Sequence, residues 1–204
     1  DPDQPLMMIG NGGFEYDDPT GINLLPYFWR AGTGDGVERT FLYPPYTGLG
    51  GDCESFAYPG GGATVSLRAD TQEAKVVHSG RRCLQVAGVQ PNSMPVDGTG
   101  VWSPVFPARP GDTFRIGFWV RGQDLEPIEG RALAAFAEFS GRTGQHRTRV
   151  DLATAFPVGL GTFDWREVTT AARVPETARR VTLFLGLRPA RGSLWLDDVS
   201  LGVQ

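Results

Sequence analysis

The sequence predicts an all-β protein, an antiparallel β-sandwich of the jelly-roll type. Short segments in which apolar and polar residues alternate recur along the chain, and alternation with period two is typical of half-buried strands. Turn-forming residues separate these segments, in keeping with 28 Gly and 16 Pro among 204 residues. Helical periodicity is nearly absent, and the best helix candidate, residues 175–180, spans one or two turns at most. Many short strands joined by tight turns indicate a sandwich or jelly roll.

The strands are expected where the alternation is clearest, at 63–68, 83–89, 101–106, 114–122, 132–140, 181–187 and 193–201. In the segment FRIGFWVRG, every second residue from Phe114 to Val120 is apolar, so this face should look into the core. Arg115, Trp119 and Arg121 then point to the opposite face. A Trp between two Arg residues on an outer face indicates either a binding surface or a surface that a loop covers.

Residues 31–62 differ from the rest of the chain. The runs GTGDG, YPPYTGLGGD and YPGGG fill this span with Gly, Pro and Tyr and leave little room for a strand. We therefore expect a long loop insertion, which in compact domains is usually functional or disordered. Its Tyr43 and Tyr46 are candidate ligand-binding residues. No linker or internal repeat interrupts the chain elsewhere, so residues 1–204 are expected to form one domain.

Charge and composition exclude some classes of binding partner. The formal net charge of −4 argues against nucleic acid, and no run of about 18 apolar residues predicts a membrane-spanning helix. The opening DPDQP indicates a processed start. Every basic residue except Lys75 is arginine, which reflects either codon usage or a preference for carboxylate and sulfate partners. Cys53 and Cys83 fit one disulfide in an exported protein or two reduced thiols.

Catalytic motifs are weak. No G-x-S-x-G sequence is present, and His78 and His146 lie in different segments without the spacing of a zinc site. The run QHR at 145–147 is compatible with a jelly-roll polysaccharide lyase in which His146 acts as base and an Arg neutralises a uronate. Catalysis needs several polar groups that converge, and the sequence shows no such group around His146. A solvated edge strand after the preceding turn explains the run QHR better. The chain is therefore predicted not to be an enzyme by itself.

The two ends of the chain carry carboxylates that can meet. The start contains NGGFE and the finish reads SLWLDDVSL, and terminal strands of an antiparallel sandwich are often neighbours. That arrangement brings Glu15 near Asp197 or Asp198. Strand alternation puts Asp198 on the face of two leucines, where a carboxylate is costly to bury alone. A hard cation with oxygen ligands removes that cost, and Gly13 can turn a carbonyl toward it.

Five segments in order carry a family resemblance. They are NGGFE near the start, VHSGRRCLQV at 77–86, PGDTFRIGFWVRG at 110–122, TFDWREVT at 162–169 and the closing LWLDDVSL. Together they resemble the carbohydrate-binding modules of families four, nine, sixteen and twenty-two, which are jelly rolls of the galactose-binding-domain-like type. The resemblance implies a structural calcium between the first and last strands, held by Gly13, Glu15, His78, Arg81 and Asp198. His78 and Arg81 would contribute carbonyls, the His78 imidazole would need no role, and Asp17, Asp18 and Asp197 would be solvated neighbours.

The same resemblance implies a function. It points to a non-catalytic module that binds a polysaccharide or oligosaccharide and that belongs to a secreted or cell-surface glycoside hydrolase or polysaccharide lyase, as a monomer or as a domain. The candidate carbohydrate-binding residues are Trp119, Arg115, Arg121, Tyr43, Tyr46 and Trp102. An acidic sugar is expected if the two arginines contact the ligand. The alternative is a structural or adhesion sandwich without a sugar site, in which residues 31–62 cover the concave face and bury Trp119.

Overall fold

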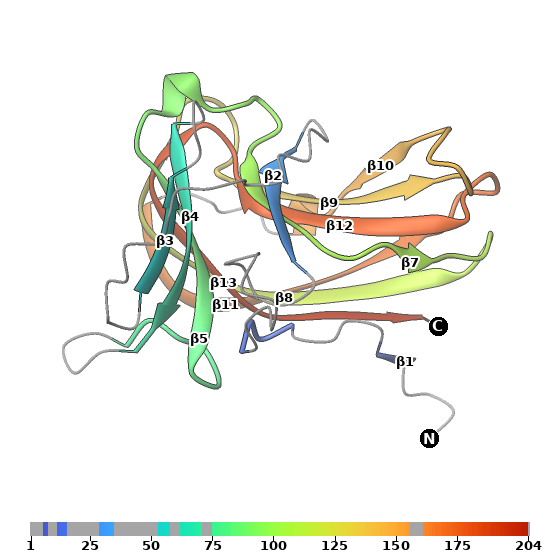
Figure 1. Ribbon diagram of the computed structural model, residues 1–204, viewed down its shortest axis with the longest axis horizontal. Helices are drawn as coiled ribbons and strands as arrows, with labels where there is room; N and C mark the ends of the chain where they lie inside the picture. The colour runs from blue at the N-terminus through green and yellow to red at the C-terminus, as the bar shows by residue number, and fades with distance from the viewer. Residues whose placement is uncertain are drawn as a thin grey trace.

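The computed structural model describes residues 6–7, 12–15, 29–34, 53–57, 62–70, 75–155 and 161–203. These residues form two antiparallel sheets that pack face to face (Figure 1). Two short 3₁₀ turns, η1 (Pro91–Ser93) and η2 (Ala153–Ala155), are the helical segments of the described part. None of the described residues belongs to a helix long and apolar enough to cross a membrane. The strands are β1 (Leu6–Met7), β2 (Arg30–Thr33), β3 (Cys53–Ala57), β4 (Ala63–Ala69), β5 (Arg82–Gly88), β6 (Thr99–Trp102), β7 (Phe106–Pro107), β8 (Thr113–Pro127), β9 (Leu133–Ser140), β10 (Thr148–Asp151), β11 (Gly161–Arg173), β12 (Arg180–Leu187) and β13 (Ala190–Val203).

The strand order confirms the predicted sandwich. One sheet runs β11-β8-β13-β5-β4-β3 with β1 beside β13, and the other runs β10-β9-β12-β6-β2 with β7 beside β12. Consecutive strands such as β8 and β9, or β11 and β12, lie in different sheets, so the chain crosses repeatedly from one layer to the other. The all-β fold class is thus as the sequence predicts. That residues 1–204 make one domain remains a prediction, because the described residues do not cover the whole range.

The core lies between the two sheets. Phe114, Ile116, Phe118 and Val120 of β8 are all fully or almost fully buried, which confirms the predicted core face of this strand. From the other sheet, alternate residues of β12 such as Leu183 are equally buried. Because burial of a large apolar side chain stabilises the fold by roughly 1.5–3 kcal/mol, these two strands supply much of the stability of the sandwich.

Some local expectations were wrong. Residues 31–62 contain a strand, because CESFA alternates and pairs with β4 as β3, with Phe56 opposite Val65. Gly- and Pro-rich neighbours hide this strand in the sequence. The helix candidate at 175–180 is only a tight turn, closed by the Ala178 N–H donating to the Pro175 carbonyl at 3.0 Å.

The cysteines lie on strands separated by β4. Cys53 of β3 is in register with Arg68 of β4, and Arg68 is in register with Cys83 of β5. Two strand spacings of about 4.8 Å place the two Cα atoms roughly 9.6 Å apart, beyond the reach of about 7 Å of a disulfide. Cys83 is a buried free thiol whose Sγ donates to the Val76 carbonyl at 3.3 Å. Cys83 is therefore reduced, and the register places Cys53 beyond the reach of a disulfide with it.

Candidate functional site

The chain ends meet as the sequence predicts. The Val199 N–H of β13 donates to the Gly12 carbonyl at 2.9 Å, and β1 pairs with the last residues of β13. Phe14 then enters the core, where it is fully buried and its ring centroid lies 5.2 Å from that of Trp29. Phe14 adopts a positive φ of 56°, which turns the chain so that Glu15 points away from the core. The aromatic residue therefore anchors the segment that presents the carboxylate.

Glu15 holds the turn that precedes β5. Its Oε1 accepts hydrogen bonds from the backbone N–H groups of Arg81, at 2.8 Å, and Arg82, at 3.1 Å. Gly80 lies against the same carboxylate at a φ of 68°, and a side chain there would overlap Glu15. The structure shows the Arg81 N–H donating to Glu15, whereas the predicted role of its carbonyl as a calcium ligand stays a prediction.

Asp197 corrects the sequence reading, which treated it as a solvated neighbour. The residue is fully buried, and burial raises the pKa of its carboxyl to about 7. Its Oδ2 accepts from the N–H groups of His78, at 3.1 Å, and Ser79, at 3.2 Å. Asp197 itself follows the strand alternation, in register with Trp119 on the outer face, and the turn at His78 and Ser79 buries it. The irregularity of β13 comes after it, between Asp197 and Ser200, where Asp198 takes a φ of 48° and leaves the face of the two leucines.

Asp198 is bound by side chains of the same turn. His78 Nδ1 lies 2.6 Å from Asp198 Oδ2, and the Ser79 hydroxyl donates to Oδ1 at 2.7 Å. The imidazole, which the family resemblance left without a role, thus joins the turn to the last strand. We call this group the terminal clasp; it consists of Gly13, Glu15, His78, Ser79, Arg81, Asp197 and Asp198.

The donors of the terminal clasp fit a calcium ion in kind. Two carboxylates lie near Gly13, since a Cβ placed there would be 3.5 Å from Asp198 Oδ1 and 3.9 Å from Asp197 Oδ1, and the Glu15 Cγ would lie 3.7 Å away. Calcium prefers carboxylate and carbonyl oxygens of this kind, and the missing side chain leaves the approach open. Among the described residues, however, no group of three His, Cys, Asp or Glu side chains converges as metal ligands, because backbone N–H groups hold the carboxylates. Calcium therefore stays a prediction.

The predicted aromatic platform on β8 is partly covered. The imidazole of His78 stacks on Trp119, with ring centroids 3.8 Å apart, and Trp165 of β11 meets the same imidazole edge-on at 5.5 Å. Arg121 donates from Nη1 to the Lys75 carbonyl at 2.7 Å. Arg115, four residues before Trp119 on β8, is exposed. The segment that lies over this face in the described part is 75–79, and a hollow of about 420 Å³ remains beside it. Its lining residues are Lys75, Val77, Arg121, Thr162, Phe163, Asp164 and Trp165.

Trp102 lies on the outer face of the other sheet and is buried. It packs with Ala134, Phe136 and Phe184 in a cluster separate from the main core, and its Nε1 donates to the Thr33 carbonyl at 3.1 Å. The guanidinium of Arg149 lies 4.6 Å from the Phe136 ring centroid. Only 5% of Trp102 is exposed, so its ring offers no open face in this structure. Tyr43 and Tyr46 lie outside the described residues, as do Asp17 and Asp18.

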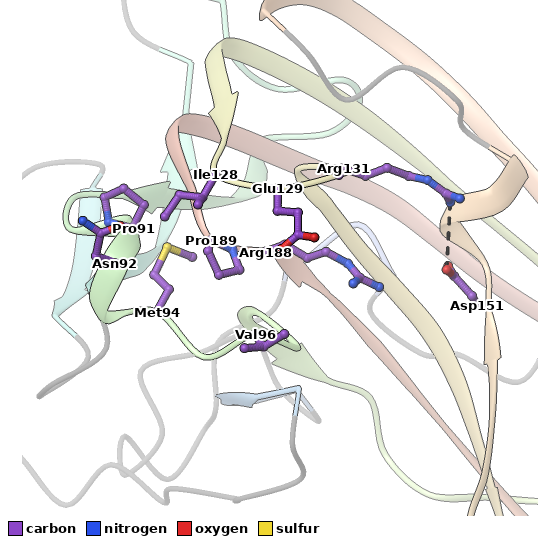
Figure 2. Close-up of a pocket in the computed structure, with 11 residues that line it drawn as sticks. Pro91, Asn92, Met94, Val96, Ile128, Glu129, Arg131, Asp151, Arg188 and Pro189 are labelled. Atoms are coloured by element: carbon purple, nitrogen blue, oxygen red, sulfur yellow. Dashed lines mark ion pairs between the residues drawn. The ribbon is translucent and has the colours of Figure 1, made fainter.

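A further pocket, which we call the loop-end pocket, lies where three turns meet at one end of the sandwich (Figure 2). Its volume is about 590 Å³, and it is formed by η1 and the residues after it, the β8–β9 turn, the β12–β13 turn and Asp151. Sequence reasoning missed it, because its residues are scattered over the chain. The one local signal is the pair of exposed apolar residues Val96 and Ile128, which are 80% and 54% exposed. The lining residues are Pro91, Asn92, Met94, Val96, Ile128, Glu129, Gly130, Arg131, Asp151, Arg188 and Pro189.

The fold was compared with known proteins. A solved carbohydrate-binding module of family 4 superposes with a TM-score of 0.52 at 16% sequence identity, and the match covers 97% of this chain and all of the module. This chain has the fold of a carbohydrate-binding module. A scan against protein-family models gave no match, and a search of curated proteins gave none either.

Two larger proteins match this chain over part of their length. The enzymatically active domain of tailspike protein 4 from bacteriophage CBA120 matches with a TM-score of 0.54 at 13% identity over 96% of this chain. A family 22 module joined to the xylanase 10B of Clostridium thermocellum matches 69% of this chain with a TM-score of 0.47 at 15% identity. The chain spans only 21% and 24% of these two proteins, respectively.

Proposed function

We propose that this chain is a non-catalytic module that binds a glycan in the loop-end pocket. The observation that carries the proposal is an apolar floor beside polar side chains without partners, in a fold shared with a family 4 module. Sugar rings present C–H faces and hydroxyl groups, so their sites combine apolar surface with a few converging polar groups. The pocket volume of about 590 Å³ lies within the usual range for such sites.

The floor and the wall of the pocket differ in chemistry. In Figure 2, Pro91, Met94, Ile128 and Pro189 gather on one side, and charged side chains extend from the other. Glu129 and Arg188 make no side-chain hydrogen bond or ion pair within the described part of the chain. They offer an acceptor and donors together, which suits hydroxyl groups that both donate and accept.

Arg131 adds a donor that lacks a hydrogen-bond partner. Its Nη1 is buried and makes no hydrogen bond to the described residues, and it lies 3.9 Å from Asp151 Oδ2, too far for a hydrogen bond. A buried donor without a partner costs free energy, which a ligand oxygen would recover. The wall therefore favours a polar ligand over a purely apolar one.

The pocket is preformed by backbone hydrogen bonds. The Ile128 N–H donates to the Pro189 carbonyl at 2.9 Å, and the Arg188 N–H donates to the Ala132 carbonyl at 2.7 Å. These bonds tie the β8–β9 turn to the β12–β13 turn. A site whose walls are fixed before binding loses less conformational entropy when the ligand arrives.

The same residues favour binding over hydrolysis. Glycoside hydrolysis generally uses two carboxylic groups on either side of the bond. Here Asp151 is engaged, since its Oδ1 accepts from the Ala153 N–H at 2.8 Å and its Oδ2 faces Arg131. Glu129 is then the one free acid of the pocket wall. His146, the candidate lyase base, is exposed on the β9–β10 turn and does not line the pocket.

We further propose a parent enzyme and a structural metal for this module. The chain would be an appendage of a larger polysaccharide-degrading enzyme that is secreted or displayed at the cell surface, and its terminal clasp would hold a structural calcium. The superposition on the family 4 module supports this reading. Trp119, Arg115, Arg121, Tyr43 and Tyr46 stay candidate sugar contacts outside the pocket, whereas Trp102 would have to be uncovered first, because only 5% of it is exposed.

Affinity electrophoresis tests the proposal. The protein is run through gels that contain xylan, mixed-linkage glucan, galactan or polygalacturonate, and at least one of these should retard it. Ile128→Ser should weaken the retarding interaction about tenfold, because it removes apolar surface from the floor. Val105→Ser is the matched control, since Val105 is 57% exposed and Ile128 54%, and it should change nothing. Retardation by none of the polymers, or equal loss in both variants, would contradict glycan binding in this pocket.

A further inference from the structure

The end of the sandwich away from η1 concentrates arginine. We call it the arginine end; it comprises residues 108–112, 140–147 and 173–180. This region contains six arginines and two carboxylates, Asp112 and Glu176, which gives a net charge of +4 in a chain whose net charge is −4. The arginines are Arg109, Arg142, Arg147, Arg173, Arg179 and Arg180, and all six are exposed.

The three turns of the arginine end are neighbours in space. The Ala108 N–H donates to the Arg179 carbonyl at 2.9 Å, and the Arg179 N–H donates to the Ser140 carbonyl at 2.8 Å. The Gly111 N–H reaches the Val174 carbonyl at 3.1 Å. Figure 1 shows the β7–β8, β9–β10 and β11–β12 turns together at this end, opposite the green 3₁₀ turn. Residues far apart in the sequence thus form one positively charged surface.

Most of this charge has no counter-charge in the protein. Arg109, Arg142, Arg173 and Arg180 make no side-chain hydrogen bond or ion pair in the part of the chain that the structure describes. Like charges gathered on one surface repel one another and produce a positive potential that attracts anions. By contrast, Arg149 on the neighbouring strand β10 is paired with Glu138 at 2.9 Å and Asp97 at 3.0 Å.

Two members of the group have partners of modest strength. Arg147 lies 3.6 Å from Glu138, whose other oxygen binds Arg149. Arg179 Nη1 donates to the carbonyls of Glu176 and Ala178, which leaves its positive charge uncompensated. At least five of the six guanidinium charges are therefore available to an external anion.

We propose that the arginine end binds a polyanionic glycan that carries carboxylate or sulfate groups. Guanidinium groups bind both anions through paired N–H donors, and arginine is favoured over lysine for this geometry. Charges spread over three turns suit a polymer with repeated anionic groups. The inference rests on the proposed function, in that the chain is taken to bind glycans, and it adds a second site with a stated ligand charge.

Nucleic acid is less well matched to this surface. Proteins that bind single strands stack bases on aromatic side chains. The segments 108–112, 140–147 and 173–180 contain no Phe, Tyr or Trp. The contacts at this end would be purely ionic, as expected for anionic groups along a polysaccharide.

The test compares two triple variants of equal net charge. The first, Arg142→Gln/Arg173→Gln/Arg180→Gln, neutralises the arginine end, and the second, Arg81→Gln/Arg166→Gln/Arg191→Gln, neutralises three exposed arginines that lie outside both this end and the loop-end pocket. Binding to polygalacturonate, to dextran sulfate and to unmodified dextran is measured at about 50 and about 300 mM NaCl, because salt screens surface charges more strongly at the higher concentration. The wild type should bind at least one polyanion, bind it more weakly at the higher salt concentration, and ignore dextran. The first variant should lose about tenfold in affinity and the second should retain it.

The outcomes separate this site from the loop-end pocket. Equal losses in the two triple variants, or no binding to either polyanion, would overturn the proposal. Equally tight binding of a duplex DNA fragment of matched charge would also overturn it, because the surface would then be a general polyanion site. The two anionic polymers distinguish carboxylate from sulfate recognition. Retardation of the first variant by the neutral glycan that binds the wild type measures the pocket independently, so failure of one site does not imply failure of the other.

Discussion

The imidazole of His78 lies flat against the indole of Trp119, with ring centroids 3.8 Å apart and planes inclined by only 17°. The same imidazole places Nδ1 2.6 Å from Asp198 Oδ2. One side chain thus connects the outer face of β8 to the bulge of β13. An indole whose face is taken by His78 is a structural contact, and a ligand can stack on it only if the turn 78–81 moves.

Replacing His78 should therefore loosen both connections. We expect His78→Ala to lower the free energy of unfolding by about 1–3 kcal/mol, because it removes a ring stack and a hydrogen bond to a carboxylate. Thermal unfolding measures the loss, and acrylamide quenching should show a more accessible tryptophan. His78→Phe is the control: it keeps a ring over Trp119 and loses the hydrogen bond, so its fluorescence should stay protected. Unchanged quenching in His78→Ala would show that Trp119 is already open in solution.

Gly80 should tolerate no side chain. Its φ of 68° strains any L-residue, and a Cβ at this position would overlap the Glu15 carboxylate. Gly111 has a φ of 86° and open space around its Cβ position, so Gly111→Ala carries the backbone strain alone. We expect Gly80→Ala to destabilise the protein by at least about 1 kcal/mol more than Gly111→Ala, as judged by urea unfolding. Equal losses in the two variants would mean that Glu15 does not rest against the turn.

Cys83 should be chemically silent in the native protein. Burial raises the pKa of its thiol far above the ordinary value, and the reactive thiolate is then scarce. In a Cys53→Ser background, a thiol reagent such as DTNB should label Cys83 only after denaturation. Reducing agent should leave the melting temperature of the wild type unchanged, because the register keeps the two cysteines apart. A lower melting temperature in reducing agent would contradict the register of β3, β4 and β5.

The strands and the core face of β8 follow from the sequence because their alternation is uninterrupted. Phe114 to Val120 alternate with polar residues, and the sheet needs nothing else to decide which face is buried. Alternation holds through Asp197, which is in register with Trp119 on the outer face, and fails only after it, at the bulge before Ser200. The Asp197 carboxylate is buried because the turn at His78 and Ser79, more than 100 residues earlier in the chain, covers it.

The sites were harder to predict than the strands. The terminal clasp could be predicted from the sequence, since Glu15 and the closing DD pair stand out as carboxylates beside apolar residues. The loop-end pocket was not, because Met94, Ile128 and Arg188 come together only once the sheets are stacked. The arginine end is equally invisible in the sequence, where its six arginines are spread over more than 70 residues. Surfaces made by turns depend on topology, which residue spacing does not encode.

Removal of divalent cations should destabilise the protein if the terminal clasp holds calcium. A ligand bound only by the folded state at a hundred times its Kd adds about 2.7 kcal/mol, which corresponds to a melting-temperature shift of roughly 5–10 °C for a chain of this length. EGTA should produce that shift in the wild type, and excess Ca²⁺ should reverse it. Asp197→Asn should abolish the shift because it removes a charged oxygen donor without changing shape, whereas Asp164→Asn, on the exposed part of β11, should retain it. In EGTA, Asp197→Asn should itself melt lower than the wild type, because both carboxylate oxygens accept backbone N–H bonds and an amide keeps only one acceptor oxygen. A wild type whose melting temperature ignores EGTA would show that hydrogen bonds from His78, Ser79, Arg81 and Arg82 close the clasp without calcium.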